Sequence, residues 1–300
     1  RHPVAPSEIP DAGGYSQFFE PPRELSREEI GDIVRRFVTT ARVAKKAGFT
    51  GVEIHAAHGY LISQFLSPAD NHRTDEYGGS LEGRMRFLIE IYQGMRETLG
   101  RDFPIAVKLN SCDGDSGGMS QEDSLRVAAR LSELGVDVLE VSGGTYRKPV
   151  FEETDSSAED RRRGVYFADY ARRLKELVSM PLALTGGFRS AADMEEAVSE
   201  GLTDLVGVGR PLALIPDLPQ RILNGAGRRR IELPRISTRV KALDEALGGV
   251  LVIGWYEMQM HRLAQGGYAS AQGNGLAALA FTLRRHGLGA LMPRRVARRG

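Results

Sequence analysis

The hydrophobic positions of residues 26–55 change from a helical spacing to a continuous run. Across residues 30–44, apolar side chains recur every three or four positions, which predicts an amphipathic helix. Ser26 with Glu29 three positions later is typical of a capping box at its start, and Gly48 stands where the helix would end. The run TGVEIH that follows predicts a short buried strand.

This helix–strand unit recurs along the chain. Helical patterns over residues 81–100, 120–135, 166–180 and 190–201 lead into strand patterns over residues 105–110, 136–144, 181–187 and 203–211. Such alternation with short connections is typical of a parallel sheet covered by helices. Residues able to do chemistry gather after the strand ends, which is the layout of a (β/α)8 barrel. A doubly wound sheet is the alternative, but no G-x-G-x-x-G motif follows an early strand.

The patterns supply about five helix–strand units, whereas a closed barrel has eight. We therefore expect an α/β fold in which residues 24–231 form an incomplete (β/α)8 TIM barrel, comprising about strands 4–8. Residues 1–23 are expected to be a loop remnant, and residues 232–300 a helical C-terminal extension with helical patterns over residues 237–249, 250–267 and 274–287. We interpret the sequence as the later part of a longer barrel. An open fold, or a barrel completed by another chain, is the alternative.

Composition excludes several classes of function. Lys and Arg number 40 against 39 Asp and Glu, so no net field draws the chain to nucleic acid or to an anionic membrane. Cys112 is the single cysteine, which excludes an intrachain disulfide and a cysteine-ligated iron–sulfur or zinc site. No apolar run approaches the roughly 20 residues of a membrane span. We expect a cytoplasmic protein whose partners are neither nucleic acids nor membranes.

Two glycine-containing loops follow the last two predicted strands. Gly186 and Gly187 stand between a strand and a helix, and Gly209 and Arg210 follow the next strand. Glycines let the backbone approach a ligand closely, and barrels of this class commonly bind phosphate after strands seven and eight. Arg210 adds a fixed positive charge. The pattern favours a phosphate site over the alternative that these glycines only form tight turns.

Lys108 lies near the end of the otherwise apolar strand pattern PIAVKLN. A lysine in this position has to reach water, a carboxylate or a ligand, because burying an unpaired charge is costly. Two interpretations stay open. In the first, the lysine pairs with a carboxylate of a neighbouring strand, such as Glu53 or Glu140. In the second, it holds its charge against an electron-rich ligand atom.

His55, His58 and Tyr60 come at the end of the first predicted strand and directly after it. A metal site would need further ligands, and the best-known helical motif has histidines four apart with an intervening glutamate, so no metal site is predicted. Core histidines with satisfied hydrogen bonds are a second interpretation. The third is catalytic, because imidazole N–H groups can polarise a carbonyl and a tyrosine can protonate a developing carbanion.

A long series of motifs begins at the same strand. It reads GVEIHAAHGYLISQFLSPADNHRTDEYGGSLEGRMRFLIEI and contains H-x-x-H-G-Y-L, Q-F-L-S-P and N-x-R-x-D-x-Y-G-G-S-x-E-x-R. This segment resembles the signature of the old yellow enzyme family of flavin-dependent ene-reductases and NAD(P)H:flavin oxidoreductases. TGGFRS and DLVGVGRPL resemble the later phosphate loops of that family, in the same order. The resemblance covers roughly residues 20–230 and implies a barrel with non-covalent FMN at its C-terminal face.

The resemblance also implies roles for individual residues. His55 and His58 match the pair that holds the substrate oxygen, and Tyr60 matches the tyrosine that protonates the carbon beside the activating group. Lys108 matches the basic residue beside the flavin pyrimidine ring. The residues that match the phosphate cradle are Gly186, Gly187, Gly209 and Arg210.

The signature loop between Asn71 and Arg84 is expected to be scaffolding, with Arg73 and Arg84 paired to the loop's own carboxylates. The first three strands of the family, which supply further residues to the flavin, have no counterpart in this sequence. The chain alone is therefore expected to bind FMN weakly or not at all. Its exposed strand edges also favour self-association, for instance as a homo-oligomer.

The implied reaction has two halves. NADH or NADPH reduces FMN, and the flavin then passes hydride to a small electrophilic molecule, an activated alkene or a quinone-like acceptor. Two other functions stay open. One is a non-catalytic truncated barrel without stable flavin binding. The other is a different phosphate-binding barrel enzyme, such as an isomerase or aldolase.

Overall fold

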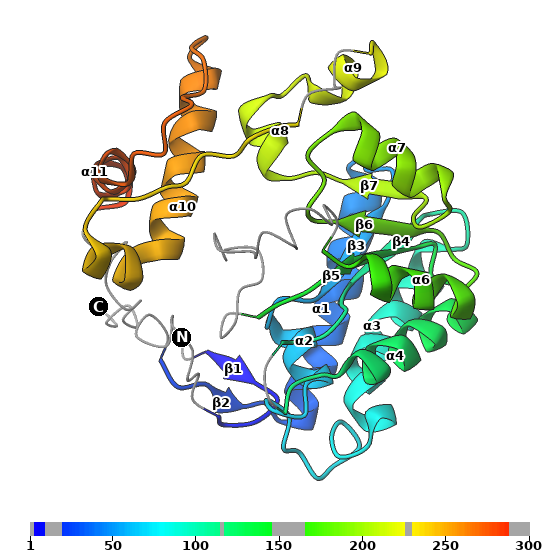
Figure 1. Ribbon diagram of the computed structural model, residues 1–300. Helices are drawn as coiled ribbons and strands as arrows, with labels where there is room; N and C mark the ends of the chain where they lie inside the picture. The colour runs from blue at the N-terminus through cyan, green and yellow to red at the C-terminus, as the bar shows by residue number, and fades with distance from the viewer. Residues whose placement is uncertain (1–2, 10–19, 115–116, 146–165, 226–229, 288–300) are drawn as a thin grey trace.

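Parallel strands in chain order form the centre of the molecule (Figure 1). The computed structural model describes residues 3–9, 20–114, 117–145, 166–225 and 230–287. The sheet found among these residues consists of β3 (Val52–Ala56), β4 (Ile105–Asn110), β5 (Val138–Ser142), β6 (Leu182–Thr185) and β7 (Leu205–Gly207). Each strand pairs with its neighbours in sequence, as in a (β/α)8 barrel. The doubly wound alternative is wrong, because such sheets reverse their strand order at a switch point.

Helices alternate with these strands and cover one face of the sheet (Figure 1). They are α1 (Arg27–Lys46), the short α2 (Leu61–Leu66), α3 (Leu81–Leu99), α4 (Gln121–Leu134), α6 (Ala168–Leu177) and α7 (Ala191–Ser199). The strand side chains that face them form the main core, and Ile54, Val107, Leu139 and Leu184 are at most 1% exposed. The five predicted helix–strand units are therefore confirmed, and α2 is a turn of helix that the sequence pattern did not predict.

Serine side chains start four of the helices by accepting a backbone N–H of the first turn. These residues are Ser26, Ser80, Ser120 and Ser190. At α1 the capping box is complete, because the Glu29 carboxylate accepts from the Ser26 N–H while the Ser26 hydroxyl accepts from the Glu29 N–H. The capping prediction at Ser26 is confirmed, and Gly48 with a φ of 87° follows the helix end.

Replacing Ser26 by alanine is expected to lower the free energy of unfolding by about 1 kcal/mol, because the Glu29 N–H loses its acceptor. Urea unfolding followed by circular dichroism measures the change. Thr40→Ala is the matched control, since its hydroxyl only bonds back to the Arg36 carbonyl within the same helix. Equal losses for both variants would contradict a capping role.

Polar side chains occupy the other face of the sheet, where the interior of a barrel would be. The register pairs His55 with Lys108 and Lys108 with Glu140, so these three side chains lie in one row across β3, β4 and β5. Glu53 lies two positions before His55 on the same face. Thr185 extends the row onto β6, where its hydroxyl donates to Glu140 at 2.7 Å. This face therefore holds a row of polar and ionisable side chains.

A two-strand ladder, β1 (Val4–Ala5) with β2 (Arg23–Glu24), lies beside the signature loop (Figure 1). Arg73, with its side chain 4% exposed, joins the two by donating to the carbonyls of Pro6 and Leu25 and to the Asp75 carboxylate. The predicted pairing of Arg73 inside the loop is confirmed.

The predicted pairing of Arg84 is wrong. The Arg84 guanidinium bonds to Asp123 at 2.6 Å, in the first turn of α4, rather than to a carboxylate of its own loop. It also donates to the carbonyls of Leu66 and Gly79. Arg84 therefore ties the signature loop to the next helix–strand unit, a contact between segments far apart in sequence.

The described chain after β7 contains helices, and those that follow residue 232 lie in the predicted helical extension. The described helices after β7 are α8 (Arg210–Leu214), α9 (Leu218–Leu223), α10 (Lys241–Ala264) and α11 (Gly275–His286). The two helical segments predicted within 237–267 are a single helix, α10. Figure 1 shows α10 and α11 across the open side of the sheet from α3 and α4. Trp255, fully buried, forms a second small core there with Tyr256 and Ala278. The domain boundary at residues 231 and 232 stays a prediction.

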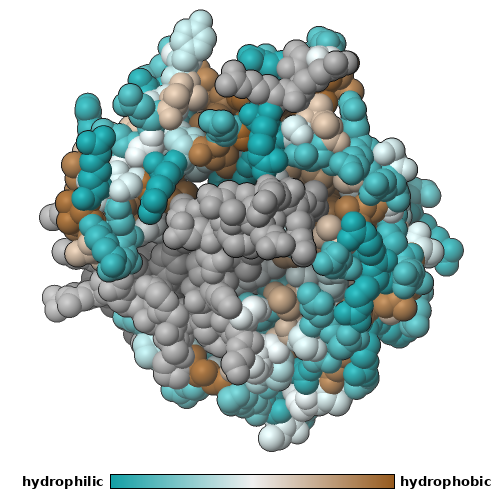
Figure 2. Space-filling view, in the orientation of Figure 1, coloured by the Kyte–Doolittle hydropathy of each residue, from teal (hydrophilic) through white to brown (hydrophobic). Residues whose placement is uncertain are grey.

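On the face seen in Figure 2, hydrophobic residues are scattered among hydrophilic ones. Within the described part of the chain, no helix is both long enough and apolar enough to span a membrane. The described residues of β3 and β7 each pair on one side only, so the sheet has two edges. Edges of this kind favour association with another strand.

Candidate active site

The end of β3 presents His55, His58 and Tyr60 together. His58 and Gly59 have φ angles of 63° and 74°, so the chain turns sharply through the left-handed region before α2 begins. A non-glycine residue with positive φ is uncommon, and such strain is often found at functional sites. The Asn110 side chain stabilises the turn by accepting from the His58 backbone N–H at 3.2 Å. The turn brings the ring centroids of the two histidines to 5.1 Å.

The surroundings of both histidines favour the neutral imidazole. The Ala57 N–H donates to Nδ1 of His55 at 3.3 Å, which leaves the proton of the neutral ring on Nε2. Burial, followed by the charge of Lys108, lowers the pKa of His55. Burial, followed by His55 and Lys108, lowers the pKa of His58 to about 4. The Nε2 atom of His58 lies 2.7 Å from the Ser142 hydroxyl, which fixes its ring.

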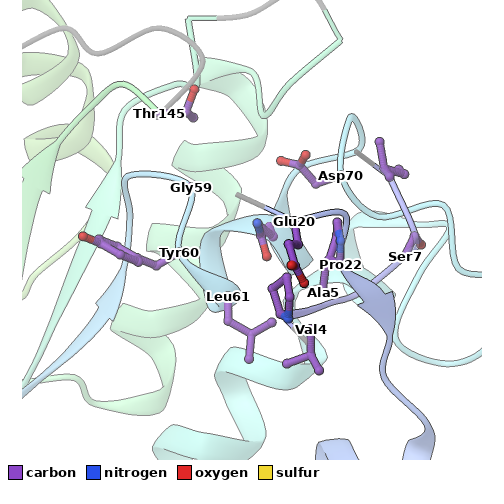
Figure 3. A pocket seen from close by; sticks show the side chains of 13 residues that line it. Val4, Ala5, Ser7, Glu20, Pro22, Gly59, Tyr60, Leu61, Asp70 and Thr145 are labelled. Atoms are coloured by element: carbon purple, nitrogen blue, oxygen red, sulfur yellow. The ribbon is translucent and has the colours of Figure 1, made fainter. Parts of the chain in front are cut away.

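Tyr60 lies between the histidines and a cavity of about 260 Å³. Its ring centroid is 4.8 Å from that of His55, and its side chain is 48% exposed. Figure 3 shows the Tyr60 ring turned away from Val4, Ala5 and Pro22, which line the far side of that cavity. The hydroxyl therefore points away from this apolar wall.

Lys108 pairs with carboxylates of neighbouring strands, as the first of its two interpretations predicts. Its ammonium lies 2.7 Å from a carboxylate oxygen of Glu140 and 3.9 Å from one of Glu53. The Lys108 side chain is 19% exposed, so part of it still faces the open side of the sheet. The ion pair is observed, and a contact with a ligand stays a prediction.

The two glycine-containing loops meet at a second cavity, of about 480 Å³. Its lining includes all four predicted phosphate-site residues, Gly186, Gly187, Gly209 and Arg210. The φ angles of Gly186 and Gly187 are 122° and 91°, which a residue with a side chain rarely adopts. A Cβ atom on Gly209 would meet no atom within 4 Å, so the cavity is open at that backbone. These features allow an anionic group to approach the main chain closely.

Arg189 was not predicted as a site residue, yet it lines the same cavity beside Arg210. Burial, followed by the charge of Arg210, lowers the pKa of Arg189. Across the part of the chain that is described, neither arginine forms an ion pair with a carboxylate. Two guanidinium groups placed together in this way favour a nearby anion. The signal was its place two residues after the glycine pair in TGGFRS.

Helix α10 supplies a further wall that sequence reasoning missed. Tyr256, Ile253 and Met260 line the cavity opposite the glycine loops. Both arginines lower the pKa of Tyr256, although burial raises it more. The C-terminal extension therefore shapes the predicted phosphate site, which no local pattern in the sequence indicates.

The predicted site residues form two groups, both towards the C-terminal ends of the strands. The histidines, Tyr60 and Lys108 lie at β3 and β4, whereas the glycines and arginines lie after β6 and β7. Thr185 links the groups, because it lines the second cavity and donates to Glu140, the partner of Lys108. Nowhere in the described residues do three His, Cys, Asp or Glu side chains gather as metal ligands would.

Comparison with known proteins gives a consistent result. Residues 2–228 match the sequence profile of the NADH:flavin oxidoreductase / NADH oxidase family. An NADH oxidase of Thermoanaerobacter brockii is 40% identical over 224 residues, which are 74% of this chain and 33% of that protein. An NADH-dependent flavin oxidoreductase of Hypocrea jecorina is 40% identical over 210 residues, 68% of this chain and 52% of the relative. The chain thus spans about a third to a half of these relatives.

Solved structures agree. A 2-naphthoyl-CoA reductase complex matches with a TM-score of 0.68 and 31% identity, over 75% of this chain and 33% of that one. The old yellow enzyme homologue of Zymomonas mobilis matches with a TM-score of 0.61 and 29% identity, over 77% and 63%. A histamine dehydrogenase of Rhizobium, 24% identical, matches in fold across the whole chain with a TM-score of 0.68 and over 39% of its own. The resemblance to old yellow enzymes is confirmed, and the chain belongs to the NADH:flavin oxidoreductase / NADH oxidase family.

Proposed function

We propose that this chain carries the acceptor-binding and phosphate-binding parts of an FMN-dependent oxidoreductase. The reaction passes hydride from NADH or NADPH, through the flavin, to an activated alkene or a quinone-like acceptor. The observation that supports this proposal is the presence of two sites towards the C-terminal ends of the same strands. Two neutral histidines stand at one end, and two arginines without carboxylate partners among the described residues stand at the other.

The residues of the second cavity fit the phosphate of FMN. The positive φ angles of Gly186 and Gly187 and the open space at Gly209 would admit a phosphate, and Arg189 and Arg210 would balance its charge. Lys108, paired with Glu140, would hold its positive charge beside the flavin pyrimidine ring. Bound FMN would supply the hydride transfer itself.

The histidine end fits an acceptor oxygen. The Nε2 proton of His55 is free of the local backbone bond and would donate to a carbonyl or nitro oxygen. Tyr60 carries a hydroxyl on the same side, placed to protonate the carbon beside the activating group. Family members named cinnamate reductase and morphinone reductase act, by their names, on small molecules, which agrees with a small electrophilic acceptor.

Replacing Arg210 or Arg189 by alanine is expected to weaken FMN binding about 10- to 100-fold, since each removes one charged partner of the phosphate. Binding of riboflavin, which lacks the phosphate, is expected to stay unchanged. Because the chain alone is expected to bind FMN weakly, fluorescence titration of the full chain is carried to high concentrations of each flavin, where both constants can be compared. Arg221→Ala is the matched control, because this arginine is 57% exposed and pairs with Asp217 outside the cavity.

If the full chain binds FMN no more tightly than riboflavin, the phosphate assignment is wrong. A chain that takes up neither flavin, even with NADPH and an enone present, supports the non-catalytic alternative.

The same preparations test two further parts of the proposal. Gel filtration reports whether the strand edges cause self-association as a homo-oligomer. Cell fractionation tests the cytoplasmic location, for which a single cysteine is the support.

A further inference from the structure

Two carboxylates share one ammonium on the polar face of the sheet. Lys108 on β4 stands between Glu140 on β5, at 2.7 Å, and Glu53 on β3, at 3.9 Å. The Glu140 and Lys108 side chains are 18% and 19% exposed, while that of Glu53 is 36% exposed. Three formal charges therefore meet in a partly dehydrated place, where one positive charge cannot balance two negative ones.

The surroundings shift the pKa values of the two carboxyl groups in opposite directions. Burial, followed by the hydrogen bond and charge of Glu140, raises the pKa of Glu53 to about 7. Burial also raises the pKa of Glu140, but hydrogen bonds from Glu53, Lys108 and Thr185 outweigh it and leave that pKa below its ordinary value. Two neighbouring carboxyl groups whose pKa values differ in this way hold one proton between them.

Among the described residues, the two histidines of the candidate site are the titratable groups whose pKa responds to the charges of this cluster. Lys108 on β4 lowers the pKa of both, and Glu140 on β5 raises it. From β6 the facing group is the neutral hydroxyl of Thr185. The charges of the Glu53–Lys108–Glu140 cluster therefore affect the pKa values of the two histidines, which the proposed function assigns to the acceptor oxygen.

We propose that Glu53 and Glu140 hold a single proton beside Lys108 and act as positioning residues, which cancel the lysine charge and so set the protonation of His55 and His58. Glu140 carries the negative charge, and Glu53 carries the proton and donates it to Glu140. The proposal uses the site of the proposed function, but it concerns groups of this chain alone and does not depend on bound flavin.

The two glutamates are therefore expected to behave differently when each is changed to glutamine. Glu140→Gln removes the carboxylate that raises the pKa of both histidines, so their titration midpoints shift to lower pH, and Glu53, without the hydrogen bond and charge of Glu140, titrates below pH 7. Glu53→Gln replaces a group that is already neutral below pH 7, so the midpoints stay where they are. Nitrogen-detected NMR of the histidine rings of the full chain, from pH 3.5 to 8, measures both. Glu133→Gln is the control, because this exposed carboxylate pairs with Arg130 on the far side of α4.

A shift of the histidine midpoints in Glu53→Gln equal to that in Glu140→Gln would overturn the proposal, since Glu53 would then be ionised. A second measurement covers the case in which a variant folds poorly. In the unaltered chain labelled with ¹³C at glutamate, one carboxyl is expected to titrate near pH 7. If every glutamate titrates below pH 5.5, the proposal fails. If the pattern holds but no variant binds FMN, the proton pair stands and the proposed function fails for this chain.

Discussion

Replacing Arg73 by alanine is expected to lower the free energy of unfolding by about 3–5 kcal/mol, because a buried pair would lose one partner. The Arg73 side chain is 4% exposed, and its guanidinium donates to the carbonyls of Pro6 and Leu25 as well as to Asp75. All three acceptors would be left without that donor. The loss is a large share of the stability of an ordinary domain and is measured by urea unfolding.

The control for this variant is Arg27→Ala, which removes another arginine paired with the same Asp75. The Arg27 side chain is 63% exposed and lies 3.4 Å from Asp75, so its removal is expected to cost about 0–1 kcal/mol. Similar losses for the two arginines would show that burial and the carbonyl contacts of Arg73 add nothing. The assignment of the signature loop as scaffolding would then fall.

Replacing Trp255 by alanine is expected to destabilise α10 and α11 by about 3–5 kcal/mol, because it empties the centre of the second core. The indole is fully buried, packs edge-on against Tyr256 and donates to the Gln272 carbonyl at 3.1 Å. Hydrogen exchange resolved by peptide is the right measurement, since it reports each segment separately. Faster exchange is expected in the extension, with little change in the sheet.

Tyr268→Ala is the control, since that aromatic side chain is 89% exposed and its removal is expected to change little. If the Trp255 variant accelerates exchange across β3–β7 by the same factor, the extension and the barrel form one cooperative unit. That result would overturn the predicted division at residues 231 and 232. It would also show that the α10 wall of the second cavity depends on the sheet.

Local patterns were sufficient to predict the helix–strand series. Each apolar run had the length of a strand and four of the helices had a serine at the start, so the strands over 105–110 and 182–185 lie where they were expected. The merging of two segments into α10 was not predicted, because the glycines at 248 and 249 are typical of a helix end. In the structure they lie inside α10, and Gly249 is buried.

The candidate site was only partly predictable for a different reason. His55, His58 and Lys108 belong to motifs that can be recognised one strand at a time. The partner of Arg84 on α4, the place of Arg189 beside Arg210 and the Tyr256 wall all join segments that lie far apart in sequence. Contacts of this kind depend on how the helices pack, and periodicity carries no information about them.

The order of the strands also bears on how the chain folds. Within the sheet, β4, β5 and β6 each pair with the strands directly before and after them along the chain, while β3 and β7 pair with one such neighbour. The connections run from residues 186–204, between β6 and β7, up to residues 57–104, between β3 and β4, and the entropic cost of loop closure is lowest for the shortest one. We expect the sheet to grow by successive addition of units, with the β6–β7 pair, which has the shortest connection, able to form early. Slow phases of refolding are then expected to report on the docking of the extension and not on the assembly of the sheet.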